Sequence, residues 1–296
     1  GLILAMAETA EGHGCDSVWV GDSLTAKPRL EALGVLSAVA ARTSRVRLGT
    51  AVLLAALRHP VLLAQTVATL DIISGGRTVL GVGVGGAFTP EMRQEWLAAT
   101  VPPSQRAGRL EETLTLLRRL WTEPAVTFHG RHFHLDDVAL EPKPAQRSGV
   151  PILIACHQRA GVEAQFRRVA ALGDGYISIT DSPQQYAETA RAVKRYALEE
   201  GREFRTMEAV FYMTVNLHAD KDRAEDEANA YLLQYYGVNH WGDRWGPFGP
   251  PSAVVAAMKS YVAAGAGTII LRFASFDPLS QLSAFAREVM PAFAAE

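Results

Sequence analysis

Short apolar runs alternate with longer amphipathic stretches along the whole chain. Seven runs have the length and the apolar content of buried strands, and the segments between them carry apolar residues at helical spacing. The predicted strands are residues 17–20, 46–54, 78–84, 151–155, 175–179, 210–217 and 268–273. The predicted helices are residues 2–13, 30–42, 60–73, 106–121, 161–172, 183–200, 219–235, 251–264 and 279–293.

The regular alternation of strands and helices predicts an α/β fold with a parallel sheet. The strands are apolar on both faces and spread over the chain without a linker-like break. These features favour a single (β/α)8 TIM barrel over residues 1–296. The pattern changes only between residues 122 and 147, where two short apolar segments flank His129-Gly130-Arg131 and predict a hairpin insertion.

A closed barrel of this type needs eight strands, but only seven are found and the first predicted element is a helix. We therefore expect the first strand to be absent from this chain and to precede Gly1 in the gene product. The alternatives are a barrel that is open at one seam, or a first strand at residues 1–4 where the pattern favours helix.

Composition narrows the possible partners. The chain has 296 residues and a net charge of −2, which gives no reason to expect binding to nucleic acid. No apolar run approaches the roughly 18–20 residues that span a bilayer, so no membrane segment is predicted. Cys15 and Cys156 lie far apart in the sequence, which favours a reducing cytoplasm over a disulfide framework. His129, His132 and His134 lack a matched acid or cysteine set, so no metal site is predicted.

Glycines occupy every second position of one predicted strand. Gly81, Gly83 and Gly85 share one face, because successive strand residues point to opposite sides. Glycine inside a strand often marks the close approach of a ligand, and we favour that explanation over a crowded barrel interior. The glycines also match a dinucleotide fingerprint formally, but no helix obviously opens at Gly86 and no acid follows at the expected distance.

Several local patterns occur together in one order. They are Gly14-Cys15-Asp16-Ser17-Val18-Trp19-Val20-Gly21-Asp22, Arg47-Leu48-Gly49-Thr50-Ala51-Val52, Arg58-His59-Pro60, Ser74-Gly75-Gly76-Arg77, the glycine strand, Arg106 with Glu111-Glu112, Leu172-Gly173-Asp174-Gly175-Tyr176 and Phe248-Gly249-Pro250-Pro251. The series resembles the bacterial luciferase-like monooxygenases over essentially the whole chain.

The resemblance implies a barrel that binds F420 or FMN at the carboxyl ends of its strands, where barrel enzymes place their sites. It implies that Ala51 and Val52, which match a non-proline cis peptide of relatives, lie against the cofactor ring. The cofactor phosphate is expected near Gly85, Gly86 and Arg159, and Gly83 is expected to contact the cofactor as well.

The same resemblance points to catalytic candidates. Asp22 and Ser23 end the first predicted strand, where relatives often have an acid followed by histidine, so the obvious imidazole is missing here. Cys156 and His157 replace a glycine- or serine-rich phosphate turn of relatives. We take Asp22, Ser23 and His157 as catalytic candidates and Cys156 as a cofactor contact. A strand-end cap at Asp22 and a surface loop at residues 156–159 are the structural alternatives.

Two functions from different classes remain open. The leading hypothesis is an F420- or FMN-dependent oxidoreductase or monooxygenase acting on a small organic substrate. The other is a catalytically silent or cofactor-free barrel that acts as a binding protein.

The helices predicted at residues 30–42 and 61–73 are apolar around most of their circumference, which predicts a homodimer packed through them.

Overall fold

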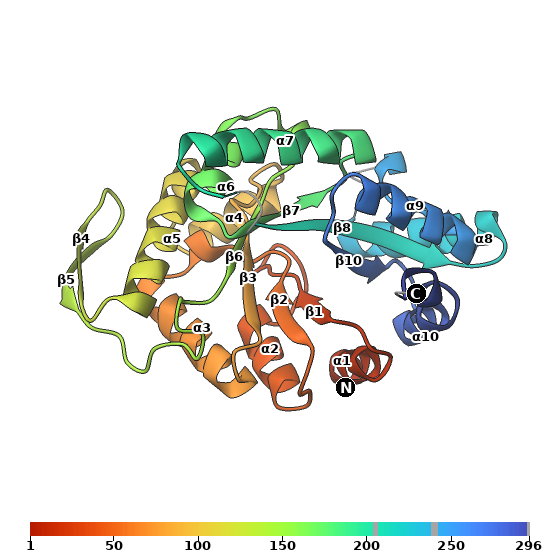
Figure 1. Cartoon of the computed structure of the whole chain (residues 1–296), viewed down its shortest axis with the longest axis horizontal. Coiled ribbons are helices and arrows are strands. Elements are labelled where there is room, and N and C mark those ends of the chain that lie inside the picture. Colours follow the sequence, from red (N-terminus) through yellow and green to blue (C-terminus); the bar gives the residue numbers. More distant parts are fainter. Residues whose placement is uncertain (204–206, 238–241, 295–296) are drawn as a thin grey trace. The chain divides into compact units, whose positions relative to one another are not determined.

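The computed structural model describes residues 1–203, 207–237 and 242–294. Within them the chain forms two compact units, each of strands and helices (Figure 1). The N-terminal unit comprises residues 16–155 and 168–174, and the C-terminal unit comprises residues 1–15, 156–167 and 175–296. All seven predicted strands are present, and within each unit the main sheet is parallel, as the alternation predicted.

The sheet of the N-terminal unit has the strand order β1-β2-β3-β6. Its strands are β1 (Ser17–Val20), β2 (Arg47–Thr50), β3 (Thr78–Val82) and β6 (Ile152–Ala155), and its helices include α2 (Ala32–Ala40), α3 (Pro60–Ser74) and α5 (Arg106–Thr122). Every residue of β3 is buried. Parallel strands that are covered on both faces are apolar at every position. These strands are therefore visible in the sequence as continuous apolar runs, without alternating apolar and polar residues.

Local chemistry sets both ends of α3. His59 caps the helix, its Nδ1 accepting a hydrogen bond from the Val61 amide at 3.3 Å, and Pro60 occupies the first turn. The helix ends at Gly75, whose φ of 68° lies in the left-handed region that favours glycine. Both ends of α3 are therefore set by residues next to them in the sequence.

One helix was missed by the pattern. Helix α4 (Pro90–Ala98) follows the glycine strand, and Thr89 caps it through a hydrogen bond from the Met92 amide. Only Glu95 and Trp96 of this helix are buried. A helix that buries one acid and one tryptophan has no apolar stripe, so hydrophobic periodicity could not indicate it.

The insertion is an antiparallel hairpin of β4 (Val126–His129) and β5 (His134–Val138), which stands out at the left of Figure 1. Glu112 of α5 holds its turn, because its carboxylate accepts hydrogen bonds from the amides of Arg131, His132 and Phe133 at 2.8–3.1 Å. The predicted hairpin is therefore present, with its second strand starting later than the pattern suggested.

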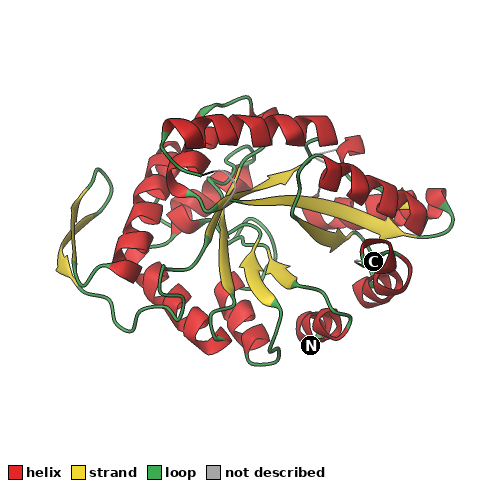
Figure 2. Ribbon diagram, viewed as in Figure 1, coloured by secondary structure: helices red, strands yellow, loops and turns green. Residues whose placement is uncertain are grey.

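The C-terminal unit carries the sheet β7-β8-β10, and the two-residue strand β9 pairs with β8. Figure 2 shows the strands in yellow and the helices in red. Its strands are β7 (Gly175–Ile179), β8 (Glu208–Leu217), β9 (Phe248–Gly249) and β10 (Thr268–Phe273). Its helices are α1 (Leu2–Gly12), α7 (Pro183–Glu199), α8 (Lys221–Tyr236), α9 (Pro251–Ala263) and α10 (Pro278–Glu288). Helix α6 (Ala164–Leu172) begins in this unit.

Helix α1 opens the chain and packs beside α10. Residues 2–12 are therefore helical, as predicted, and the alternative of a first strand at residues 1–4 is wrong. In the described part of the chain, no helix combines the length and the apolar character that crossing a membrane requires.

Candidate active site

Asp22 follows β1, where the carboxyl end of the strand was expected to present a catalytic group. Its side chain is 1% exposed and forms a two-pronged ion pair with Arg58, with Nη1 to Oδ2 at 2.7 Å and Nη2 to Oδ1 at 3.0 Å. Oδ2 also accepts the Leu54 amide at 3.0 Å. Both carboxylate oxygens are thus engaged by the protein, so the geometry favours the strand-end cap over a catalytic acid or base.

Arg58 connects this carboxylate to a second one, because its Nη2 also donates to Glu31 Oε1 at 2.9 Å. Burial alone lowers the pKa of Arg58, but the hydrogen bonds and charges of Asp22 and Glu31 outweigh burial and leave that pKa raised. The sequence indicates Arg58 only as part of a family pattern. Its partner lies 36 residues away, beyond the reach of any local signal.

Ser23 is held in a similar way. Its hydroxyl donates to Glu95 Oε1 at 2.7 Å, and the same oxygen accepts the amides of the following three residues. The Ser23 oxygen in turn accepts the Lys27 amide at 3.0 Å. The hydroxyl proton is therefore committed to Glu95, and the expectation that Ser23 offers a hydrogen bond to a substrate is not supported by this arrangement. Glu95, which is 3% exposed, was not a candidate from sequence.

The end of β2 carries the expected backbone feature, since the Ala51–Val52 peptide bond is cis. Val52 also explains the neighbouring glycine. A Cβ placed on Gly83 would lie 2.7 Å from Val52 Cγ2 and 3.6 Å from Ala155 Cβ. Protein atoms, and not open space, therefore face Gly83.

The next two glycines are explained in the same way. A Cβ on Gly85 would lie 2.7 Å from the Trp96 ring, and one on Gly86 would lie 2.9 Å from the Phe88 ring. Gly85 also has a φ of 75°, which favours glycine independently. The atoms beside Gly83 and Gly85 fit the crowded-interior alternative, and the approach of a ligand to the backbone of these glycines stays a prediction.

The turn after β6 carries the remaining candidates, and they differ sharply in exposure. Cys156 is fully buried, and burial, reinforced by the charge of Asp181, raises the pKa of its thiol far above the ordinary value. That thiol is inert as a nucleophile. Arg159, by contrast, is exposed.

His157 is held by its backbone. Its amide donates to Gln165 Oε1 at 3.1 Å, and its carbonyl accepts Gln165 Nε2 at 2.8 Å. Burial lowers the pKa of His157, and the carboxylate of Asp181 opposes this only in part. The imidazole is therefore neutral at pH 7 and has a nitrogen that can accept a proton.

Asp181, which follows β7, organises this turn. Its Oδ2 accepts the Gln158 amide at 2.9 Å and the hydroxyls of Ser178 and Thr189 at 2.8 and 3.1 Å. Asp181 is 1% exposed, and sequence reasoning missed it because its three donors come from three separate segments.

Two buried polar atoms of this turn, His157 Nδ1 and Gln158 Oε1, and Oδ1 of the neighbouring Asp181 have no hydrogen-bond partner within the described residues. Buried polar atoms in proteins are nearly always paired, so these atoms make the turn a candidate for contact with a ligand.

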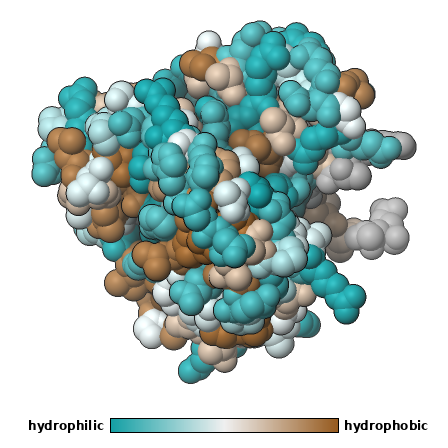
Figure 3. Space-filling model, turned by 90° about the vertical axis from the view of Figure 1, so that its left-hand side faces the viewer, coloured by the Kyte–Doolittle hydropathy of each residue, from teal (hydrophilic) through white to brown (hydrophobic). Residues whose placement is uncertain are grey.

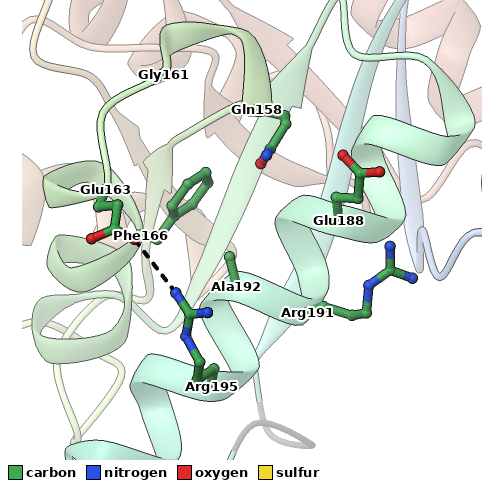
Figure 4. Close-up of a pocket in the computed structure, with 8 residues that line it drawn as sticks. All are labelled: Gln158, Gly161, Glu163, Phe166, Glu188, Arg191, Ala192 and Arg195. Atoms are coloured by element: carbon green, nitrogen blue, oxygen red, sulfur yellow. Dashed lines mark ion pairs between the residues drawn. The ribbon is translucent and has the colours of Figure 1, made fainter.

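A hollow of about 590 Å³ lies beside the same turn (Figure 4). The Gln158 side chain points into it, and Arg195 at its rim lies 3.7 Å from Glu163. It is lined by Gln158, Gly161, Glu163, Phe166, Glu188, Arg191, Ala192 and Arg195. Its walls combine one aromatic ring with charged groups of both signs.

Comparison with known proteins gives a consistent result over the whole chain. The sequence profile of the luciferase-like monooxygenases matches residues 2–267. An F420-dependent glucose-6-phosphate dehydrogenase from Kineococcus radiotolerans is 32% identical over 98% of this chain and 92% of its own length.

Two solved structures are similar in fold. The monooxygenase RslO1 from Streptomyces bottropensis has a TM-score of 0.84 and 26% identity, and the match covers 99% of this chain and 93% of RslO1. An F420-dependent secondary alcohol dehydrogenase, solved with an F420–acetone adduct, has the same TM-score at 22% identity, over 99% of this chain and 94% of its own.

Proposed function

The chain belongs to the luciferase-like monooxygenase family, and from this premise we propose that it is an F420-dependent dehydrogenase of a small hydroxylated substrate. Its α/β fold is the luciferase-like TIM-barrel type, and its cofactor is F420 or FMN. The choice of F420 is carried by the full-length similarity to F420-dependent glucose-6-phosphate dehydrogenases.

The residues of the turn after β6 fit such a cofactor or its substrate. The atoms without partners at Gln158 and Asp181 are oxygens that accept hydrogen bonds, and His157 Nδ1 accepts as well when it is unprotonated. Arg159 is exposed, and we propose that it pairs with the negatively charged cofactor phosphate. In the N-terminal unit, Ala51 and Val52 at the end of β2 are the proposed ring contacts. Gly83, Gly85 and Gly86 stay proposed contacts through their backbone, since their side-chain positions are filled.

F420, when bound, accepts a hydride from the substrate carbon. The substrate hydroxyl must then lose its proton to a base. Asp22 and Ser23 are engaged elsewhere, so we assign this role to His157, whose Nδ1 lacks a partner within the described residues and whose ring is neutral.

Separate titrations with F420 and FMN test the cofactor. We expect F420 to bind at least about tenfold more tightly than FMN, which corresponds to about 1.4 kcal/mol. Loss of F420 absorbance on adding glucose-6-phosphate or a secondary alcohol then tests the reaction. Tighter binding of FMN would contradict the F420 assignment, and binding of neither would support the cofactor-free alternative.

His157→Gln is expected to lower kcat by about 10²–10⁴-fold, because general-base catalysis contributes an amount of that order. The sign of the pH dependence follows from the lowered pKa of His157. Wild-type activity should persist below the ordinary histidine range and fall as pH drops through that lowered pKa, because protonated imidazole cannot accept the substrate proton.

F420 titration of the His157→Gln variant is the control, and its affinity should stay near the wild-type value. A variant that keeps both its turnover and the acidic limb of its pH profile would remove His157 from the mechanism.

We also propose the homodimer predicted from sequence, packed through α2 and α3. On α3, Leu62, Ile72 and Ile73 are 64%, 42% and 52% exposed, which is more apolar surface than an isolated helix face needs. Figure 3 shows one face of the molecule, on which hydrophobic side chains lie exposed among hydrophilic ones.

A cytoplasmic location is proposed as well, since neither cysteine forms a disulfide.

The double variant Leu62→Glu, Ile73→Glu is expected to be monomeric, because two charges would be buried without partners at the interface. Light scattering at micromolar protein measures this. The control is Leu198→Glu on α7, where the leucine is equally exposed at 64% and the dimer should persist. A wild-type protein that is monomeric would refute the proposal.

A further inference from the structure

One arginine, Arg272, lies inside the C-terminal unit on β10, where it pairs in register with Thr214 of β8. The next residue, Phe273, packs its ring against Phe285 of α10 at 6.1 Å, so the side chains at 272 and 273 point to opposite faces. Arg272 therefore lies on the sheet face away from α10, which in a barrel of this class is the interior.

Strand β8 has the same two faces. Phe211 stacks on Tyr261 of α9 at 3.7 Å, which marks its helix-facing side. Successive strand residues point to opposite faces, so Tyr212 and Thr214 lie on the face opposite to Phe211. This is the face that carries Arg272. The interior face of these two strands thus presents one cation, one hydroxyl and one aromatic ring.

The guanidinium is held in a fixed position. Its Nη2 donates to Thr214 Oγ1 at 2.9 Å, and its Nη1 donates to the Tyr236 hydroxyl. The rings of Trp245, Tyr236 and Tyr212 surround it, with centroids at 4.5, 5.3 and 5.8 Å. These contacts orient the planar fork and offset part of the cost of its burial.

The charge of Arg272 is not balanced by the protein around it. Within the described residues no carboxylate pairs with Arg272, and its Nε is buried without an acceptor. Other enclosed arginines of the chain are balanced, since Arg58 pairs with Asp22 and Arg168 pairs with Glu111 at 2.9 Å. A buried cation without an anion is costly, so such a group is retained where a ligand brings the negative charge.

We propose that Arg272 anchors an oxyanion group of the substrate, a phosphate or a carboxylate. Its Nε–H, which has no acceptor among the described residues, is a donor for this group, and the rings of Trp245 and Tyr212 flank the organic body next to it. This assignment rests on the proposed function, because it names the class of substrate that the dehydrogenase takes. It makes Arg272 a specificity-determining residue for anionic substrates.

Calorimetric titration of the F420-saturated protein tests the assignment with three probes of similar size. Glucose-6-phosphate carries a phosphate, glucuronate carries a carboxylate and glucose is neutral. We expect at least one anionic probe to bind about tenfold or more tightly than glucose, as one well-placed ion pair provides. The stronger of the two anionic probes identifies the oxyanion.

Arg272→Met should remove that preference, and Arg272→Lys should retain part of it, because lysine keeps the charge but not the planar fork. The matched control is Arg223→Met on α8, where the arginine is exposed and the preference should be unchanged. If Arg272→Met does not fold by thermal melting, Arg272→Lys decides alone.

Undiminished anion preference in either folded Arg272 variant would overturn the proposal, and so would a wild-type protein that binds glucose as tightly as both anions. Failure of the proposed function shows itself differently, as absence of F420 binding in the separate cofactor titration. Should F420 not bind, the same three probes are titrated into the protein alone, and the same outcomes apply.

Discussion

Arg58→Met is expected to lower the free energy of unfolding by about 3–5 kcal/mol, the range for removing one partner of a buried ion pair. The large effect follows from Asp22, which is 1% exposed and would lose the arginine with which it forms its ion pair. Urea denaturation of the variant and the wild type measures the difference. Because Arg58 itself is 20% exposed, water can reach part of the site, and we expect the lower end of the range.

Glu31→Gln is the control for this prediction. It removes the other carboxylate that Arg58 contacts, but Glu31 is 53% exposed and its pair with Arg58 is open to solvent. Such an exposed pair contributes about 0–1 kcal/mol to the free energy of unfolding. Equal losses in the two variants would show that Asp22 is not the group that makes Arg58 important.

Gly83→Leu is expected to abolish cofactor binding while the far-UV circular dichroism stays close to that of the wild type. The Cβ atom of the new side chain would already lie 2.7 Å from Val52 Cγ2, so Val52 must move from its place at the end of β2. Val52 is a proposed contact of the cofactor ring. Overpacking of this kind also costs about 1–3 kcal/mol of stability.

A compensating pair of changes tests whether crowding against Val52 causes this loss of binding. Gly83→Ala should weaken F420 binding, and combining it with Val52→Ala should recover part of the affinity, since the shorter side chain vacates the space. A Gly83→Leu variant with wild-type affinity for both F420 and FMN would place the site elsewhere.

Elements whose signals are local were predictable from sequence. The strands are short apolar runs because they are buried on both faces, and α3 carries its own start and stop signals at Pro60 and Gly75. The order of family-like patterns was also visible, and the family assignment it supported is confirmed. Helix α4 was missed because it buries an acid and a tryptophan instead of an apolar stripe.

The chemistry of the candidate site was decided by partners far away in the chain. Sequence showed Asp22 and Ser23 at a strand end, but not that Arg58 and Glu95, 36 and 72 residues onward, already occupy them. It showed the glycines of β3 without the Val52 and Trp96 side chains that fill the space beside them.

By itself, the sequence determined the alternation of strands and helices, the family and the turn that carries His157, because each depends on residues close together in the chain. Only the tertiary structure decided which polar groups have hydrogen-bond partners. Among the described residues, it leaves buried nitrogen atoms of His157 and Arg272 without one. The physical reason is that a buried charge or hydrogen-bonding atom is satisfied by whatever the fold brings within about 3 Å, whatever its distance in sequence.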